Sequence, residues 1–282
     1  MKIKIILSAI ALLGLFEGTA QEFFYDDHTE KYGVKDKSGN VVVKPKFNQV
    51  SDFIEGSGLH EVMINDKYGI VNSMGQVILP VIYDMIEAYN PYVGNLLLYV
   101  KVNDKYGFIN QQGKIIVSPT YSYTDDKFRD GRRRVGLGTG GDGMDLYGFI
   151  DEQGKLVIPC KYKYTTHFSE DLASVEHNGK WGYLDRAGNL VIPYKFDAAG
   201  YFSEGLAATV MTVGYEEEYG ERYPDQKLGF IDKSGKTVIP YQYDPGSSFT
   251  SSGLPVFNEG IVNVYGSDTR TWFLNKAGKR VK

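Results

Sequence analysis

The sequence predicts an all-β fold in which about seven tandem antiparallel β-meander repeats form an open or curved, solenoid-like array. Three observations lead to this prediction. One short segment recurs along the chain at offsets of about 34 to 47 residues, within the range of known repeat architectures. Every copy of that segment carries the same kind of turn. The chain also contains 22 Tyr, 15 Phe and 33 Gly, a composition that favours strands and turns over helices.

The recurring segment is clearest between Lys180 and Pro193, and its copies start near residues 31, 67, 105, 146, 180, 228 and 271. Each copy opens with a short aromatic and β-branched run such as Tyr147–Ile150. Successive side chains of such a run point to opposite faces, which is typical of a β-strand. We therefore expect a first strand at the start of every repeat.

A turn follows the first strand in all seven copies. It consists of Asp or Asn, two free positions and Gly. The Asx side chain accepts backbone N–H bonds, and Gly supplies the positive φ that lets the chain return. We therefore interpret these acidic residues as turn residues rather than catalytic ones. The pairs are Asp36 and Gly39, Asn72 and Gly75, Asn110 and Gly113, Asp151 and Gly154, Asp185 and Gly188, Asp232 and Gly235, and Asn275 and Gly278.

Two further strands complete the expected repeat. The second reads Val-Ile-Pro or similar, and because Pro cannot donate to a ladder it belongs at a strand end, a bulge or an edge. A second turn of the form aromatic-x-acid-Gly follows, as at Phe202–Gly205, and a third strand such as Leu206–Val210 comes after it. Each repeat is thus predicted to be a three-stranded meander, too small to bury its own apolar face, so repeats must stack.

This pattern resembles the WG repeat (also called KWG) family of bacterial proteins. The resemblance rests on aromatic-Gly-aromatic-aliphatic-Asp-x-x-Gly-Lys-x-Val-Ile-Pro and on the turn at Phe202–Ala207, and it covers essentially the whole chain after the first twenty residues. Only Trp181 keeps the Trp that gives the family its name, and in the last copy Trp272 occupies the Gly position, as expected of a terminal cap. The resemblance implies a repeat β-architecture with an interaction role, and it supplies no catalytic residues.

The number of repeats leaves a closed β-propeller as the alternative architecture. Seven units suit a propeller. Three strands per unit rather than four, uneven offsets and an atypical last unit favour the open array.

Residues 1–20 have the pattern of a signal peptide. Lys2 and Lys4 form a basic start, residues 5–16 form an apolar run, and residues 18–20 form a small-residue cleavage site for a signal peptidase. The apolar run is shorter than the roughly 20 residues that span a bilayer, which disfavours the alternative of an N-terminal anchor. We expect residues 21–282 to form one WG-repeat domain without a stable membrane span, exported to the periplasm or to the extracellular or cell-surface space.

Composition and spacing exclude several classes of function. A formal net charge of −4 lacks the basic footprint of a nucleic-acid binder. The single Cys160 cannot form an internal disulfide. No metal-ligand spacing links the four histidines, which are His28, His60, His167 and His177.

Motifs that resemble enzyme sites lack the structural context that such sites require. The glycines between Gly136 and Gly141 match a dinucleotide fingerprint, but no βαβ unit surrounds them. His167–Asp171 contains triad-type residues, yet its Phe-Ser-Glu portion is the family turn. We expect no cofactor, no metal and no catalysis.

Two insertions break the period at the same place, between a third strand and the next first strand. They contain the candidate binding residues, because loops at equivalent positions of an array project from one side. The alternative is that both are tolerated solvated loops. A third insertion, at 245–255, is interpreted as a flexible loop. The candidates are Arg132, Arg133 and Arg134 in the first insertion, and Tyr215, Glu216, Glu217, Tyr219 and Tyr223 in the second.

These features predict a binding or scaffolding module at the cell envelope whose partner is another protein or a cell-envelope polymer. A carbohydrate-binding module is the alternative, because the 22 tyrosines could stack on sugar rings. Most of these tyrosines occupy repeated positions, so we interpret them as core residues of half-buried strands.

Overall fold

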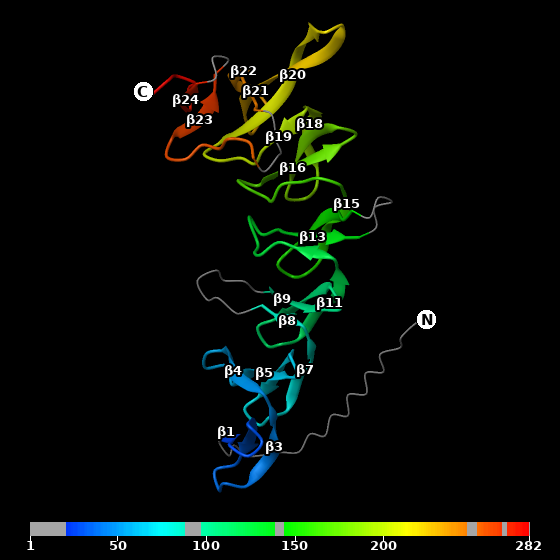
Figure 1. Cartoon of the computed structure of the whole chain (residues 1–282), viewed down its shortest axis with the longest axis vertical. Coiled ribbons are helices and arrows are strands. Elements are labelled where there is room, and N and C mark those ends of the chain that lie inside the picture. The colour runs from blue at the N-terminus through cyan, green and yellow to red at the C-terminus, as the bar shows by residue number, and fades with distance from the viewer. Residues whose placement is uncertain (1–20, 88–96, 139–143, 247–252, 267–269, 282) are drawn as a thin grey trace, which may run out of the picture. The chain divides into compact units, whose positions relative to one another are not determined.

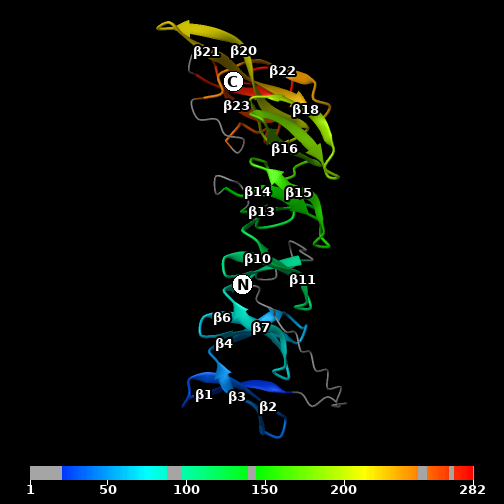
Figure 2. The same ribbon diagram turned by 90° about the vertical axis from the view of Figure 1, so that its right-hand side faces the viewer.

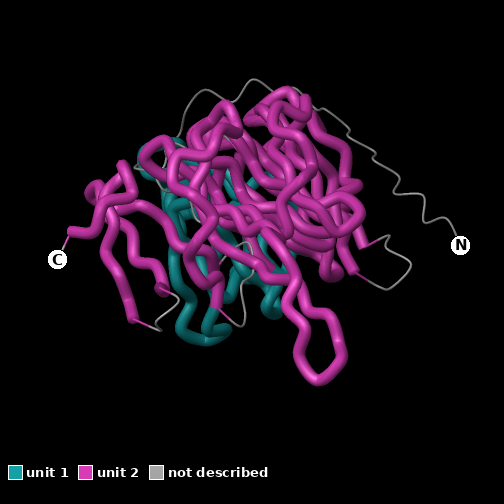
Figure 3. The backbone as a smooth tube through the Cα atoms, turned by 90° about the horizontal axis from the view of Figure 1, so that it is seen from above, with its two compact units in different colours: residues 1–84 teal, residues 85–282 magenta. Residues whose placement is uncertain are grey.

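The computed structural model describes residues 21–87, 97–138, 144–246, 253–266 and 270–281, and the chain divides into two compact units, 1–84 and 85–282 (Figure 3). Each unit is considered by itself. The predicted signal peptide lies outside the described residues, as do residues 139–143 of the first insertion and 247–252 of the third.

The described residues form strands and turns, without a helix. Unit 1 holds two antiparallel sheets, with strands β1 (Glu22–Asp26), β2 (Lys31–Lys35) and β3 (Val41–Phe47) in the first, and β4 (Gln49–Ile54), β5 (Leu59–Ile64), β6 (Lys67–Asn72) and β7 (Val77–Tyr83) in the second. The described part of unit 2 holds five sheets. The first two have four strands each: β8 (Met85–Ile86), β9 (Leu97–Val102), β10 (Lys105–Asn110) and β11 (Ile115–Tyr121), then β12 (Tyr123–Thr124), β13 (Arg133–Leu137), β14 (Leu146–Ile150) and β15 (Leu156–Tyr162). The other three are β16 (Leu172–His177) with β17 (Lys180–Asp185) and β18 (Leu190–Phe196); β19 (Ala198–Ala199) with β20 (Leu206–Glu218), β21 (Glu221–Asp232) and β22 (Thr237–Tyr243); and β23 (Ile261–Tyr265) with β24 (Thr271–Asn275).

The sheets of unit 2 follow one another in chain order (Figure 1). Each buried apolar cluster joins one sheet to the next, and no ladder among the described residues pairs the last sheet of the unit with its first. The predicted all-β, open repeat arrangement is confirmed, and the expectation of stacked rather than independent units with it.

The prediction of one three-stranded meander per repeat is wrong. A sheet combines the third strand of one repeat with the first two strands of the next, as in β16-β17-β18. Four of the sheets add a further strand, which has two residues in β8, β12 and β19 and six in β4. The reason is a tight hairpin between third and first strands. Its two-residue turn has positive φ at both positions, which matches the twist of antiparallel strands. These turns are Asn65-Asp66, Asn103-Asp104, Asn178-Gly179 and Tyr219-Gly220.

The glycine of the aromatic-Gly signature lies opposite a bulge that contains the repeat's proline. Trp181 pairs with Phe196 and Tyr183 with Ile192, so the second strand carries extra residues there. A Cβ on Gly182 would lie 2.6 Å from the Ile192 carbonyl oxygen. The same carbonyl contact, at 2.4 to 2.8 Å, recurs at Gly33, Gly69, Gly107, Gly148 and Gly229.

The Asx turns form as predicted. In all seven copies the Asx Oδ1 accepts two backbone N–H bonds, as Asp185 does from Ala187 and Asn189 at 2.9 Å. The turn glycine also packs between sheets: Gly188 has φ of 87° and its missing Cβ would lie 3.1 Å from Ile158. Glycine is therefore required there by both backbone angle and packing.

The aromatic-Ser-Glu-Gly turns connect successive repeats to one another. The Ser169 hydroxyl donates to the Phe202 carbonyl at 2.7 Å, and the Glu170 carboxylate accepts the Gly205 N–H at 3.0 Å. Ser203 and Glu204 make the same bonds to the turn at Phe257–Gly260. The Ser and Glu of these two turns thus make hydrogen bonds between successive repeats of this chain.

Trp272 occupies the glycine position of the last repeat, in strand β24, which pairs with β23. On its other side β24 makes a bridge between Leu274 and Arg280, and Phe273 accepts the Val281 N–H at 2.8 Å.

Candidate functional site

The two insertions lie in the hairpins β13–β14 and β20–β21 of unit 2, the same structural place in two sheets. Their candidate residues are placed very differently. Arg133 and Arg134 begin strand β13 and are not part of the connecting loop. Tyr215–Tyr223 form the far end of the second hairpin.

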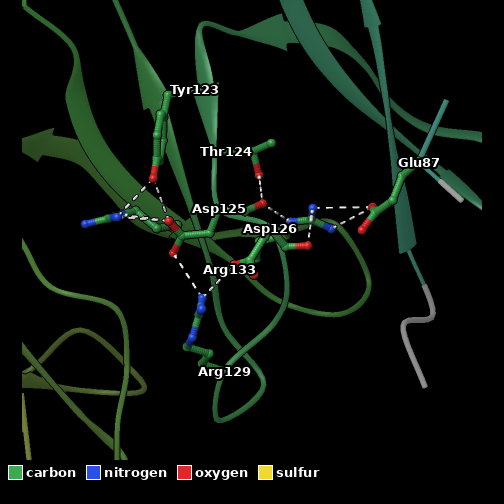
Figure 4. A network of polar contacts seen from close by, with 8 residues as sticks. Glu87, Tyr123, Thr124, Asp125, Asp126, Arg129 and Arg133 are labelled. Atoms are coloured by element: carbon green, nitrogen blue, oxygen red, sulfur yellow. Dashed lines mark hydrogen bonds and ion pairs between the residues drawn. The ribbon is translucent and has the colours of Figure 1, made fainter. Parts of the chain in front are cut away.

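The Arg133 side chain is fully buried, with 0% of the residue exposed. Its Nε donates to the Asp125 carbonyl at 2.9 Å, and its Nη2 donates to the Asp126 carbonyl at 3.1 Å (Figure 4). Both Nη atoms lie 3.3 Å from Glu87 Oε2. The guanidinium also lies 5.2 to 5.6 Å from the ring centroids of Tyr99, Phe108 and Phe128. The opposite charge of Glu87, the hydrogen bonds to carbonyls and the aromatic faces together stabilise this buried cation.

Glu87 is the acidic partner in this buried cluster. Burial raises the pKa of its carboxyl group, and the neighbouring Arg133 charge opposes that rise. The matching position of the sheets formed by β16 and β20 holds a small apolar residue, Ala173 or Ala207. The Arg133–Glu87 pair therefore replaces part of the apolar core in this one sheet.

Arg134 and Arg132 are also bound by groups of the protein itself. Arg134 donates from Nη2 to Asp125 Oδ1 at 2.9 Å and from Nη1 to the Thr165 carbonyl at 2.5 Å. Asp125 also accepts the Tyr123 hydroxyl at 2.8 Å (Figure 4). Arg132 donates from Nε to the Arg186 carbonyl at 2.8 Å, reaching the next sheet.

The interpretation of Arg133 as a candidate binding residue is therefore corrected, because its side chain is fully buried and cannot face a partner. Arg132 and Arg134 are partly buried and connect neighbouring sheets. The physical reason for the burial of Arg133 is that the Glu87 carboxylate and the carbonyls of adjacent segments accept its hydrogen bonds inside the fold. Glu87 lies 46 positions from Arg133, so no local sequence signal indicates the pairing.

The second hairpin is much longer than its counterparts. Strands β20 and β21 have 13 and 12 residues, whereas β16 and β17 have six each. The neighbouring strands β19 and β22 pair only with its base, at Thr209 and Val210 and from Leu228 onward. Residues 213–226, here called the arm, project from the sheet as a two-stranded ribbon (Figures 1 and 2). No described strand pairs with the outer edges of the arm.

The arm has two distinct faces, because directly paired residues of an antiparallel ribbon share a face. One face carries the pairs Glu216–Tyr223 and Glu218–Glu221. The other carries Tyr215–Pro224 and Glu217–Arg222, and there the Arg222 guanidinium lies 4.2 Å from the Tyr215 ring centroid. At the tip Tyr219 is 97% exposed.

The tyrosines that end the second strands are core residues, whereas those that precede the signature glycine are only partly buried: Tyr32, Tyr68, Tyr106 and Tyr147. Tyr83, Tyr121, Tyr162 and Tyr243 end the second strands and are buried, and Tyr183 is completely enclosed. Burial raises the pKa of Tyr183 well above its ordinary value. Three exposed tyrosines, by contrast, lie together on the arm: Tyr215, Tyr219 and Tyr223.

A family model described as WG containing repeat matches residues 32–68, 68–106, 106–135, 147–181, 181–211 and 229–254. The chain belongs to the WG repeat family. Most of these matches begin at or next to the aromatic residue that precedes the bulge-facing glycine. They end before the last copy of the WG repeat, in which Trp272 replaces that glycine.

No curated protein matches this WG-repeat chain. Among solved structures it is similar to the "eukaryotic initiation factor", at 11% identity and a TM-score of 0.41, covering 94% of this chain and 63% of that one. It is also similar to BamB from Moraxella catarrhalis (10% identity, TM-score 0.33, 86% and 77% covered). A third structure is the WD40 beta propeller domain of Doa1 (11% identity, TM-score 0.34, 84% and 81% covered). The chain thus spans less than two thirds of the initiation-factor chain.

Among the residues that the structure describes, no helix of the WG-repeat chain is long and apolar enough to cross a membrane.

Proposed function

We propose that this WG-repeat protein is an exported binding or scaffolding module of the cell envelope, without catalysis, that contacts another protein or an envelope polymer through the arm. The observation that carries the proposal is the arm itself. It extends a regular hairpin by exposed tyrosines and glutamates, and no described strand pairs with its outer edges.

Export is part of the proposal and rests on residues 1–20, with their basic start and short apolar run. Fusing residues 1–20 to a reporter that is active only outside the cytoplasm tests it. Signal from this fusion, lost when Leu12, Leu13 and Leu15 are replaced by Asp, is the expected result. A fusion protein found only in the cytoplasm would contradict export.

The binding proposal is tested by a pull-down from envelope extract. The bait is the chain from residue 21 onward, compared with a variant in which 215–225 are replaced by Asn-Gly, a dipeptide that closes a two-residue hairpin. A partner captured by the first and lost from the second is the expected result. Equal capture by both baits would move the binding surface to the repeats.

A carbohydrate-binding role is the second candidate, and the three exposed tyrosines of the arm favour it because aromatic rings stack on apolar sugar faces. Glycan-array binding that disappears when Tyr219 and Tyr223 are replaced by Ser would support this candidate. Unchanged array binding in that variant would exclude the arm as the sugar site.

A further inference from the structure

We propose that the partner of the arm is an extended, Lys- and Arg-rich protein segment that adds to an unpaired edge of the arm as a third strand. Its cationic side chains lie along the face formed by Glu216, Glu218, Glu221 and Tyr223. This inference rests on the proposed binding function and names the class of partner.

The arm concentrates the negative charge of the chain. Five of the 35 acidic residues and one of the 31 basic residues lie within 215–225, so the rest of the chain carries equal numbers of both. The net charge of −4 thus belongs to this one ribbon. A charge displayed on a projecting element attracts a partner of opposite sign and accelerates its association.

The charge is arranged on one face rather than spread over both. Glu218 and Glu221 are directly opposite each other across the hairpin, and Glu216 lies on the same face. Directly opposed like charges destabilise a strand pair, so this arrangement weakens the isolated arm. Cations supplied by a partner remove that repulsion. Nearer the base of the arm, Asp225 already has such a cation, because Lys227 Nζ lies 2.5 Å from its carboxylate.

The opposite face shows within the molecule how an aromatic residue of the arm accepts a cation. There the Arg222 guanidinium stacks 4.2 Å from the Tyr215 ring centroid, and Glu217 is its cross-strand neighbour. Tyr223 is exposed on the acidic face, where its hydroxyl donates to Glu221 at 2.7 Å. A ring beside carboxylates on this face offers an incoming Lys or Arg the same combination of contacts.

The backbone of the arm determines the form of the segment. Residues 213–218 and 221–226 have no described strand on their outer sides, so their outward N–H and C=O groups are available for β-strand addition. In an added strand every second side chain falls on one face, which places alternate cations along the glutamates. A second copy of this chain does not fit, because it would bring another acidic arm against the first.

The experiment measures fluorescence anisotropy of a labelled peptide of alternating Lys and Thr titrated with the protein in the presence of a metal chelator. Binding that weakens at high salt is expected. In the variant Glu216→Gln, Glu218→Gln, Glu221→Gln we expect affinity to fall about tenfold, because three exposed ion pairs, each weak by itself, are lost together. A control, Glu217→Gln, changes the opposite face and is expected to alter affinity less than about twofold.

Two further controls test whether binding depends on the position of the glutamates rather than on the total charge, and whether the peptide binds as a strand. The variant Glu55→Gln, Asp66→Asn, Glu152→Gln removes the same charge from exposed positions elsewhere and is expected to bind as the wild type does. A peptide of alternating Nα-methyl-Lys and Pro keeps the charge but has no backbone N–H to donate to a ladder, so its binding is expected to be lost.

Equal loss of affinity in the two triple variants would overturn the proposed face, and equal binding of the Pro peptide would overturn strand addition. If the Lys peptide does not bind the wild type, the cationic class of partner is wrong. Capture of a partner through the arm in the pull-down would then leave the proposed binding function intact.

Discussion

The hairpins β13–β14 and β20–β21 are lengthened at the same place of the repeat, yet one has its charged residues inside the fold and the other displays them to solvent. In the first, Arg133 is enclosed by Glu87, two carbonyls and three aromatic rings. In the second, Glu218 faces Glu221 and Tyr219 is almost entirely exposed.

Arg133 lies at the base of its hairpin, level with Ala207, whereas the glutamates lie at the far end of theirs. Whether each charge is buried depends on the segments that lie beside it. Around β13 the acids Glu87, Asp125 and Asp126 supply carboxylates and carbonyls, so the arginines are drawn inside. Beyond Thr212 the arm has no adjacent strand, so its glutamates stay in water. We therefore expect the first hairpin to contribute to stability, and the proposed binding role falls to the second.

The largest effect is expected when the buried hairpin loses its cation. Arg133→Met leaves the Glu87 carboxylate enclosed without its partner, which should lower the free energy of unfolding by about 3–5 kcal/mol. Urea denaturation of the full chain measures it. The double variant Arg133→Met, Glu87→Leu should recover much of the loss, because it removes both charges. Stability of Arg133→Met equal to the wild type would show that the pair does not matter to the fold.

A glycine substitution distinguishes the scaffold from the arm. Gly182→Ala forces a Cβ to within 2.6 Å of the Ile192 carbonyl oxygen, whereas a Cβ on Gly214 in the arm meets no atom within 4 Å. We expect Gly182→Ala to destabilise the protein by about 1–3 kcal/mol, as overpacking does. Gly214→Ala is the matched control. Equal melting temperatures of the two variants would contradict the bulge interpretation of the WG signature.

Acid sensitivity should come in part from the Asp turns of the scaffold. Hydrogen bonds from the Asn189 and Ser234 side chains, ahead of backbone donors, lower the pKa of Asp185 and Asp232, and Asn40 does so for Asp36. A carboxyl whose pKa is lowered by folding stabilises the protein above its ordinary pKa of about 4, and that stabilisation is lost as pH falls through the lowered value.

Replacing these three residues by Asn, which already serves at Asn72, Asn110 and Asn275, should flatten the decline of melting temperature below about pH 4. The reverse variant, with Asp at those three positions, should steepen it. Identical pH profiles for all three proteins would show that these turns do not contribute to acid unfolding.

The smallest effect on stability is expected from the arm. Replacement of 215–225 by Asn-Gly should change the free energy of unfolding by less than about 0.5 kcal/mol, because the removed residues pack on no sheet. Calorimetry of the variant beside the wild type measures it. A loss comparable to that of Arg133→Met would mean that the arm is structural and would remove the contrast between the two hairpins.

Local sequence signals were sufficient for most of the repeat. Asp or Asn followed by Gly predicted all seven Asx turns, because such a turn depends on the backbone angles and donors of adjacent residues. The proline was expected at a strand end, a bulge or an edge, and it lies in a bulge. The sheet boundary was missed although Asn178-Gly179 is a strong hairpin signal, since the sequence repeat was taken as the structural unit. The arm was located correctly as an insertion.

The sequence by itself determined that the chain is an all-β array of WG repeats and where each glycine, proline and Asx turn falls. These properties follow from short-range sterics and from a period that the chain repeats. Only the tertiary structure decided that the array is open, that Arg133 is buried and that the arm has an acidic face. These outcomes depend on which segments lie beside one another, Glu87 against Arg133 and no described strand against residues 213–226, and that juxtaposition has no local signature in the chain.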